Sequence, residues 1–184
     1  MATAQEAHYR AKVRDPASWL HSAEVLRLAA SLLQRHSDDA CRAMTKMIKM
    51  GQGGAYPVLD GRTYSPQLAF HLIFTSKMLF GLALENLLKA CFVTRMQGFP
   101  GYGNRGKIKW GVNPPHCLRK YAEKAGFTIN ALEARILDDL SDCVSWQGRY
   151  PVPMKAALKE SSIGWQRGMI EALYLRIFEE LRKL

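Results

Sequence analysis

Two opposite charges occur in an otherwise apolar stretch of the chain, where Glu85 is followed four residues later by Lys89. On a helix this spacing places both side chains on one face, close enough to form an ion pair among leucines. A charged pair loses hydration in such surroundings, so it is retained where it holds a neighbouring segment in register or meets a polar ligand. The plainer alternative is a strip of partly solvated helix surface. Glu85 and Lys89 are therefore candidate ligand-binding residues.

A histidine follows a proline-rich turn, because His116 comes directly after Asn113-Pro114-Pro115. We expect a helix to begin here, and the positive end of a helix favours anions such as phosphate. The alternative is a histidine that caps the helix or hydrogen-bonds to a neighbouring helix. His116 is a further candidate ligand-binding residue. The five histidines and four cysteines lack the spacing of metal ligands, so the sequence predicts no metal and no cofactor.

The segment from Gly98 to Pro115 combines basic and aromatic side chains with five glycines and three prolines. Residues of these types bind single-stranded nucleic acids, in which cations contact the phosphates and aromatic rings stack on the bases. A solvated loop without a ligand is the alternative interpretation. The candidate nucleic-acid-binding residues are Arg105, Lys107, Lys109 and Trp110.

A second turn, from Gly148 to Pro151, carries Arg149 and Tyr150 beside a proline that restricts the backbone. Both side chains are candidate ligand-binding residues. The alternative is structural: the turn docks on the helices, with Arg149 reaching Glu85.

The pattern of residues around these candidates predicts helices. The stretch after Ser65-Pro66, up to about Gln97, is apolar nearly all round, which is typical of the central helix of a bundle. Asp15-Pro16 is a typical helix start, and the helix after it either continues through Ser37-Asp38-Asp39 or ends there. Further helices are expected at about 115–125, 130–144 and 165–184, with a loop or short hairpin at 51–64. The sequence thus predicts an all-α, up-and-down bundle of four or more helices with long Gly/Pro-rich loops, as a single domain over 15–184 with an N-terminal extension over 1–14.

The composition narrows the class of protein. The 184 residues are 48% hydrophobic and 23% charged, as in an average globular protein, which excludes a disordered or collagen-like chain. The net charge of +10 favours an anionic partner. The sequence shows no close pair of cysteines, no signal peptide and no membrane-spanning stretch. We therefore expect a cytoplasmic protein with reduced thiols and no membrane association.

Three short motifs, in this order, resemble proteins of the HEPN family. They are ALENLLKA at 83–90, PHCL at 115–118 with Ala125-Gly126 after it, and GRYP at 148–151. The resemblance extends from about Trp19 to the carboxyl terminus. It implies a helical bundle, commonly a homodimer, from prokaryotic toxin–antitoxin, defence or nucleotidyltransferase-associated systems. It also implies that the Glu85 and Lys89 pair anchors the turn that carries Arg149 and the helix begun by His116.

Many members of that family are metal-independent ribonucleases that use an arginine followed shortly by a histidine in a late helix. In this chain the late helix has Arg167 with no histidine after it. The comparable spacing occurs at Arg14 and His21, around the start of the first long helix, and these are the alternative catalytic residues. The resemblance therefore implies a member without the usual ribonuclease motif.

We expect a non-catalytic, HEPN-like binding or regulatory module for nucleic acid or a nucleotide, which acts as a homodimer. One alternative is a metal-independent endoribonuclease that uses Arg14 with His21, or His116 with a nearby arginine. The other alternative is an interaction subunit that pairs with a protein partner encoded nearby.

Overall fold

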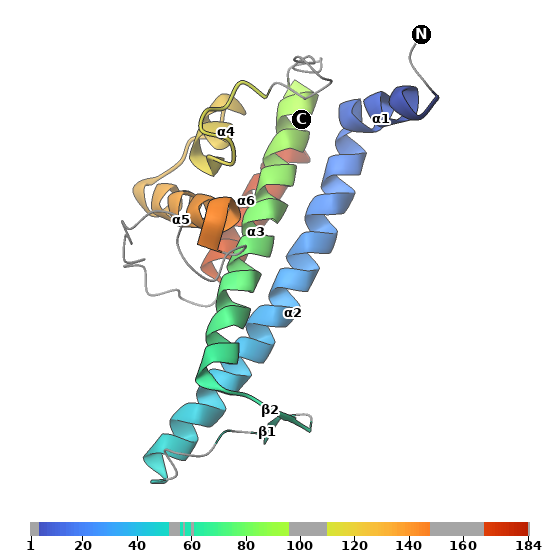
Figure 1. The fold of residues 1–184 in the computed structure, drawn as a ribbon. Coiled ribbons are helices and arrows are strands. Elements are labelled where there is room, and N and C mark those ends of the chain that lie inside the picture. Colours follow the sequence, from blue (N-terminus) through green and yellow to red (C-terminus); the bar gives the residue numbers. More distant parts are fainter. Residues whose placement is uncertain are drawn as a thin grey trace.

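A computed structural model describes residues 4–51, 56, 58–59, 61–95, 110–147 and 168–183. These residues form a helical bundle with one small hairpin, which confirms the predicted all-α class (Figure 1). A π-helical turn, Cys143–Gln147, follows directly on the helix Ala131–Asp142. The elements are α1 (Ala4–Arg14), α2 (Pro16–Lys49), β1 (Val58–Leu59), β2 (Arg62–Thr63), α3 (Pro66–Arg95), α4 (Leu118–Lys124), α5 (Ala131–Asp142) and α6 (Met169–Leu181).

Helices α2 and α3 form a long antiparallel pair joined by the β1–β2 hairpin (Figure 1). Of the two possibilities left open by the sequence, the structure shows one continuous helix through Ser37-Asp38-Asp39. Serine and aspartate disfavour a helix interior because they compete for backbone hydrogen bonds, but here both find other partners. The buried Ser37 hydroxyl donates to the Ala69 carbonyl of α3 at 3.1 Å, and Asp39 pairs with Arg42 one turn later. Packing against α3 thus overrides the local preference.

The boundary between α1 and α2 is set by Asp15, as predicted. Its carboxylate accepts hydrogen bonds from the backbone amides of Ala17 and Ser18, at 3.0 and 3.1 Å, and Pro16 occupies the first turn. The predicted N-terminal extension forms α1, whose Val13 is buried. The Val13 carbonyl accepts a hydrogen bond from the indole of Trp19 at 2.9 Å, which ties α1 to α2.

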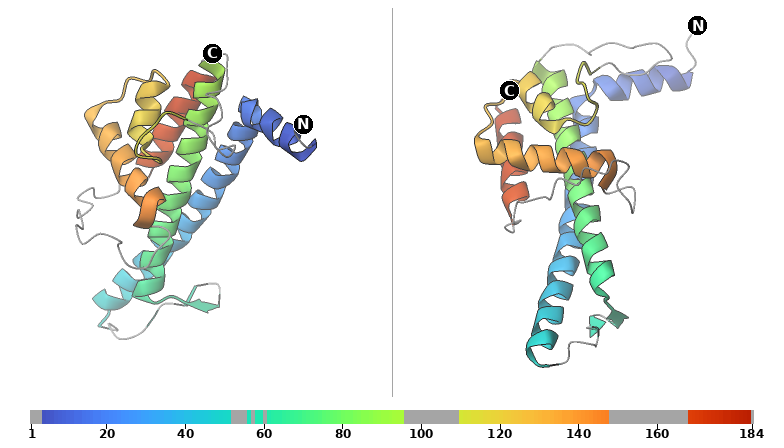
Figure 2. Two further views of the ribbon diagram at one scale, coloured as in Figure 1. Left: turned by 45° about the horizontal axis from the view of Figure 1, so that its top comes forward. Right: turned by 60° about the vertical axis from the view of Figure 1, so that its left-hand side comes forward.

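The main core lies where α4, α5 and α6 pack on the carboxyl-terminal half of α3, and α5 crosses α3 (Figure 2). The close approach of α3 to the π-helical turn requires Gly81, because a Cβ there would stand 2.5 Å from a methyl carbon of Val144. A second, smaller core of Ala40, Tyr64 and Ala69 lies near the hairpin. The largest side chains of the main core that are completely buried are Phe80, Leu84, Leu87, Leu88, Leu118, Ile136, Leu137, Leu140, Tyr174 and Ile177.

Helix α4 begins later than predicted. We expected a helix from about Pro115, with His116 in its first turn, but α4 begins at Leu118. The reason is the backbone of His116, whose φ of 67° is left-handed and cannot belong to a right-handed helix. The predicted stop is confirmed at Gly126, which has a φ of 78°. Residues 98–109 of the predicted loop at 98–115 and the predicted turn at 148–151 lie outside the described residues.

Candidate functional site

Glu85 lies on α3 with only 4% of its surface exposed, and each of its carboxylate oxygens has a partner. The Lys89 ammonium lies 2.5 Å from Oε1, one helical turn away. The imidazole Nδ1 of His116 lies 2.8 Å from Oε2. The predicted ion pair is therefore real and buried, and it holds a segment from another part of the chain.

Three aromatic rings surround the Lys89 ammonium. Its Nζ lies 5.1 Å from the ring centroid of Trp19, 5.2 Å from that of Trp110 and 5.7 Å from that of Tyr121. These distances are within the range of cation–π attraction. The rings come from α2, from the segment before α4 and from α4 itself, so one cation joins three parts of the chain to α3. We call Glu85, Lys89, His116, Trp19, Trp110 and Tyr121 the Lys89 cluster.

Edge-to-face contacts between the rings complete this cluster. The centroid of Trp110 lies 5.3 Å from that of Trp19 and 6.4 Å from that of Tyr121. A third contact, with Phe92 of α3, has a centroid separation of 6.2 Å. Rings at these distances and angles attract through their quadrupoles. Trp110, predicted to bind nucleic acid, is half-buried, and its ring contacts Trp19, Phe92 and Tyr121.

The electrostatics of the Lys89 cluster keep Glu85 ionised. Burial opposes the charged carboxylate, but the Lys89 charge and the hydrogen bonds from Lys89 and His116 outweigh it, so the pKa of Glu85 lies below its usual value. Burial, followed by the negative charge of Glu85, raises the pKa of Tyr121 above the ordinary range of tyrosine. At neutral pH Glu85 is therefore a carboxylate and Tyr121 a protonated phenol.

His116 acts as a hydrogen-bond partner of a neighbouring helix, which was the alternative to an anion site at a helix start. Its left-handed backbone turns the ring toward α3, and the amide at the start of α4, that of Leu118, donates to the hydroxyl of Ser141 on α5 at 2.9 Å. That amide is thus engaged within the protein. The side chain of His116 remains 33% exposed, so one edge of the ring reaches solvent.

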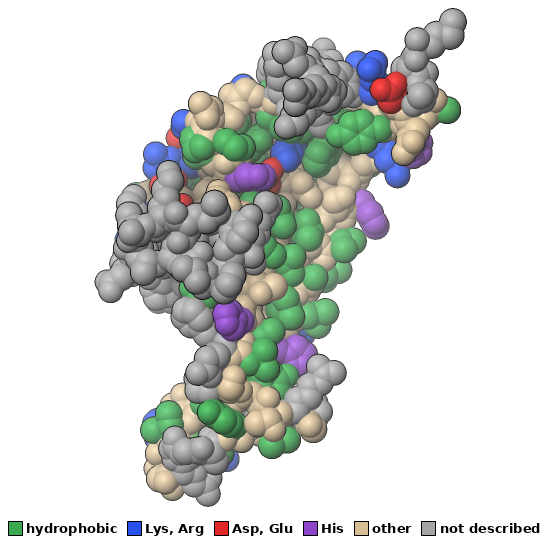
Figure 3. Space-filling view, in the orientation of Figure 1, with side chains coloured by type: hydrophobic (Ala, Val, Ile, Leu, Met, Phe, Trp, Pro, Cys, Tyr) green, Lys and Arg blue, Asp and Glu red, His purple; other side chains and the backbone are tan. Residues whose placement is uncertain are grey.

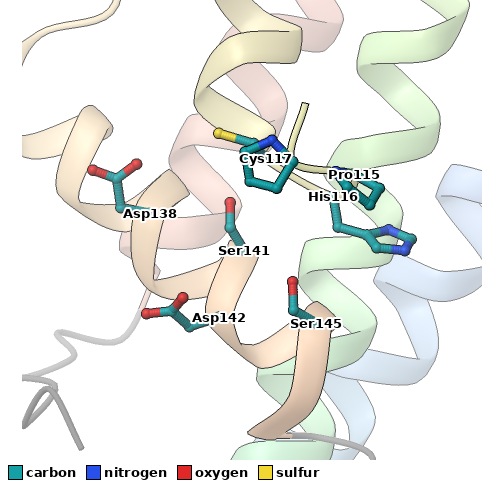
Figure 4. Close-up of a pocket in the computed structure, with 8 residues that line it drawn as sticks. Pro115, His116, Cys117, Asp138, Ser141, Asp142 and Ser145 are labelled. Carbon is teal, nitrogen blue, oxygen red and sulfur yellow. The ribbon is translucent and has the colours of Figure 1, made fainter. Parts of the chain in front are cut away.

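A pocket of about 320 Å³ lies beside His116, between the segment before α4 and one side of α5. Ser141 and Ser145 point into the space between these elements, whereas the His116 ring is turned toward α3 (Figure 4). Two carboxylates, Asp138 and Asp142, also line it, and Asp138 pairs with Arg119 at 3.1 Å. This lining is acidic and does not suit a phosphate.

Basic side chains gather at the end of the molecule that carries α1 and α4 (Figure 3). Helix α4 presents Lys120 and Lys124, which donate to backbone carbonyls of the segment at 110–113. Arg95, at the end of α3, lies with its guanidinium carbon 4.7 Å from the ring centroid of Phe127. Helix α1 adds the exposed Arg10, Lys12 and Arg14.

The remaining candidates lie apart from the Lys89 cluster or outside the described residues. Arg14 ends α1 and His21 lies on α2, both side chains are exposed, and neither lines the pocket. Among the residues that the structure describes, no group of three His, Cys, Asp or Glu side chains is placed to hold a metal ion. The candidates Arg105, Lys107, Lys109, Arg149 and Tyr150 lie outside those residues.

Sequence reasoning missed two members of the Lys89 cluster, Trp19 and Tyr121. Trp19 belongs to an apolar stripe of α2, and nothing in its local spacing marks it as a partner of Lys89. A second buried pair was also missed, in which Lys77 of α3 lies 3.4 Å from Asp139 of α5. Burial lowers the pKa of Lys77, and Asp139 counters part of that effect. The available signal was a lysine inside an apolar helix, the same signal that marked Lys89.

Comparisons with known proteins identified no match to this chain. The sequence matches no family model, and no curated protein or solved structure shows detectable similarity to it. None of the helices in the described part of the chain is long and apolar enough to cross a membrane.

Proposed function

We propose that this chain is a non-catalytic, HEPN-like binding or regulatory module that binds single-stranded nucleic acid at its basic end, and that it forms a homodimer. The basic end consists of α1, α4 and Arg95 at the end of α3. The sequence between Arg95 and Trp110 supplies the further basic residues of the proposal. The proposal places the protein in the cytoplasm, with a prokaryotic toxin–antitoxin or defence system as its setting.

The observation that carries the proposal is the convergence of basic segments at this end. Helices α1 and α4 flank the end of α3 there (Figure 1). The chain that connects α3 to Trp110 adds Arg105, Lys107 and Lys109 without an acidic residue. A cluster of cations on one end attracts phosphates and accounts for salt-dependent binding. Trp110, which directly follows Lys109 in the sequence, is itself a member of the Lys89 cluster.

The hydrogen bond between Glu85 and His116 supports the HEPN-like part of the proposal. It joins the first and second of the three motifs, as the resemblance implies. The third motif, which carries Arg149 and Tyr150, lies outside the described residues.

The same geometry supports a non-catalytic role. A general acid or base must reach the proton it transfers, and Glu85 and Lys89 are both buried and bonded to each other. The Nδ1 atom of His116 is engaged by Glu85, but the side chain is 33% exposed, so His116→Ala is included in the cleavage test. These groups hold segments together and leave phosphate contacts to the exposed basic residues.

The test measures the affinity for labelled single-stranded RNA in EDTA over a series of salt concentrations. Two double variants, each of which removes two positive charges, are compared with the wild type. Lys107→Ala with Lys109→Ala removes two cations from the sequence between Arg95 and Trp110. Lys46→Ala with Lys49→Ala removes two from the last turn of α2, at the opposite end of the molecule (Figure 1). We expect the first variant alone to weaken binding and to reduce the salt slope by about 1.4, because each lysine that neutralises a phosphate of a single strand contributes about 0.7 to that slope. Equal binding by both variants would refute the proposed site.

The same samples, run on a gel, separate the alternatives. RNA cleavage in EDTA that is lost in His21→Ala or His116→Ala would make the protein a metal-independent endoribonuclease and overturn the non-catalytic role. Absence of both binding and cleavage would shift the function to a protein partner. Competition by a mononucleotide at equal phosphate concentration would show that a nucleotide is the ligand.

A further inference from the structure

Helix α2 presents a line of exposed aliphatic side chains on the face that does not pack on α3. The exposed fractions are 53% for Val25, 49% for Leu28 and 53% for Leu32. Their spacing of three and four residues places them on one face of the helix. Exposed His21 and His36 continue this line at its two ends. We call these five residues the α2 stripe.

The buried side of the same helix shows that the stripe is a separate surface. Ala23, Ala30 and Ser37 are fully buried, and Ser37 bonds to α3. A helix with one apolar face in the core needs no second one for folding. In Figure 3, hydrophobic side chains run along the part of the surface occupied by α2 and α3. Three large aliphatic side chains in one exposed row are typical of a contact surface.

The α2 stripe is nearly palindromic: residues of the same type lie at equal distances on either side of a point next to Leu28. Val25 and Leu32 lie at similar distances on either side of that point, and His21 and His36 lie farther out. We propose that α2 packs antiparallel on α2 of a second copy of this chain, about a twofold axis beside Leu28. Val25 then faces Leu32 of the second copy, and His21 faces His36 of the second copy, as an isologous interface requires.

Charge selects the antiparallel arrangement. A parallel pair would bring Arg35 against Arg35 of the second copy and Asp39 against its equivalent, and like charges at such positions repel. In the antiparallel pair, Arg35 lies within one helical turn of Glu24 of the second copy, on the same side of the contact. Arg35 is exposed, and the Glu24 side chain is 46% exposed beside Arg27, so the opposite charges are accessible. Antiparallel helix dipoles add to this preference.

This inference rests on the homodimer in the proposed function and not on RNA binding, and a test of oligomeric state separates the two. Sedimentation equilibrium of the full chain over a concentration series is expected to show a monomer–dimer equilibrium. Leu28→Glu places two carboxylates together at the axis, so the dissociation constant should rise at least ~10-fold. Leu175→Glu is the matched control, because Leu175 is equally exposed, at 48%, but lies on α6. A chain that is monomeric throughout, or equal effects of the two variants, would overturn the proposal.

Cysteine cross-linking tests the direction of the pair. Val25→Cys and Leu32→Cys are made as separate single variants, and because both positions are exposed neither change disturbs the core. On mild oxidation with peptide mapping, a mixture of the two should form a disulfide between positions 25 and 32, and neither variant alone should form a disulfide at its new cysteine. Self-cross-linking of Val25→Cys through position 25 would refute the antiparallel pairing.

Discussion

Replacing Glu85 is expected to destabilise the fold strongly, because it leaves the buried Lys89 ammonium without its counter-ion. Removing one partner of a buried ion pair costs about 3–5 kcal/mol. The Lys89 side chain is 11% exposed, so water offers little compensation, but the rings of Trp19, Trp110 and Tyr121 still attract it. Because these three contacts partly compensate the charge that is left, we place the cost of Glu85→Ala near the lower end of that range, at about 3 kcal/mol.

Thermal unfolding followed by circular dichroism measures this effect. For a chain of this length, 1 kcal/mol corresponds to about 2–4 °C, so Glu85→Ala should lower Tm by about 6–12 °C. The control is Asp39→Ala, which breaks an exposed pair with Arg42 and should change stability by no more than ~1 kcal/mol. A double variant, Glu85→Ala with Lys89→Met, should regain part of the loss, because no buried charge then remains. An unchanged Tm for Glu85→Ala would refute the reasoning.

The pH dependence gives an independent check on the same group. The folded-state pKa of Glu85 is depressed below the usual 4.5, so its contribution to stability is present above pH 4.5 and is lost as the pH falls through the folded pKa. Glu85→Gln lacks this contribution at every pH. The difference in unfolding free energy between the wild type and Glu85→Gln should therefore be constant from pH 7 to 5 and shrink on further acidification. A constant difference down to pH 2 would show that Glu85 is not the titrating group.

Three further predictions concern other contacts. Trp110→Ala should lower the unfolding free energy by about 3 kcal/mol in denaturant titration, because it removes a half-buried ring that contacts Lys89, and a change below 1 kcal/mol would contradict that role. Asn130→Ala should cost about 1 kcal/mol, since the Asn130 side chain caps α5, and a decrease in unfolding free energy smaller than about 0.3 kcal/mol would argue against the cap. Burial raises the pKa of Cys91 and Cys143 to about 12, so neither should react with a thiol reagent at pH 8 until the protein unfolds, and prompt native-state labelling of either would contradict their burial.

The sequence predicted the parts of the site that depend on local spacing. Glu85 and Lys89 are four residues apart on one helix, so their contact follows from helix geometry alone. His116 lies 31 residues from Glu85, and only the fold can bring the two together. The same holds for Trp19, which reaches Lys89 because α2 packs along α3. Long-range contacts of this kind leave no periodic signal in a single sequence.

Helix boundaries followed the sequence where a side chain determined them locally. Asp15 caps α2 and Asn130 caps α5, and both starts lie where the sequence placed them. The predicted start of α4 was wrong, because nothing in the sequence indicates that the backbone of His116 is left-handed. The continuity of α2 was undecidable locally, because it depends on a bond between Ser37 and α3.

The two unequal cores have a consequence for how the native state opens. Within the described residues, the distal part of α2 packs on the small cluster of Ala40, Tyr64 and Ala69, whereas its first half shares the main core. A few buried contacts hold the distal part, so its backbone amides should exchange with solvent through local fraying, at far lower free energy than those near Ala23 and Ala30. The protection of backbone amides against exchange would then decrease along the single helix α2. The part of α2 near the hairpin would unfold first.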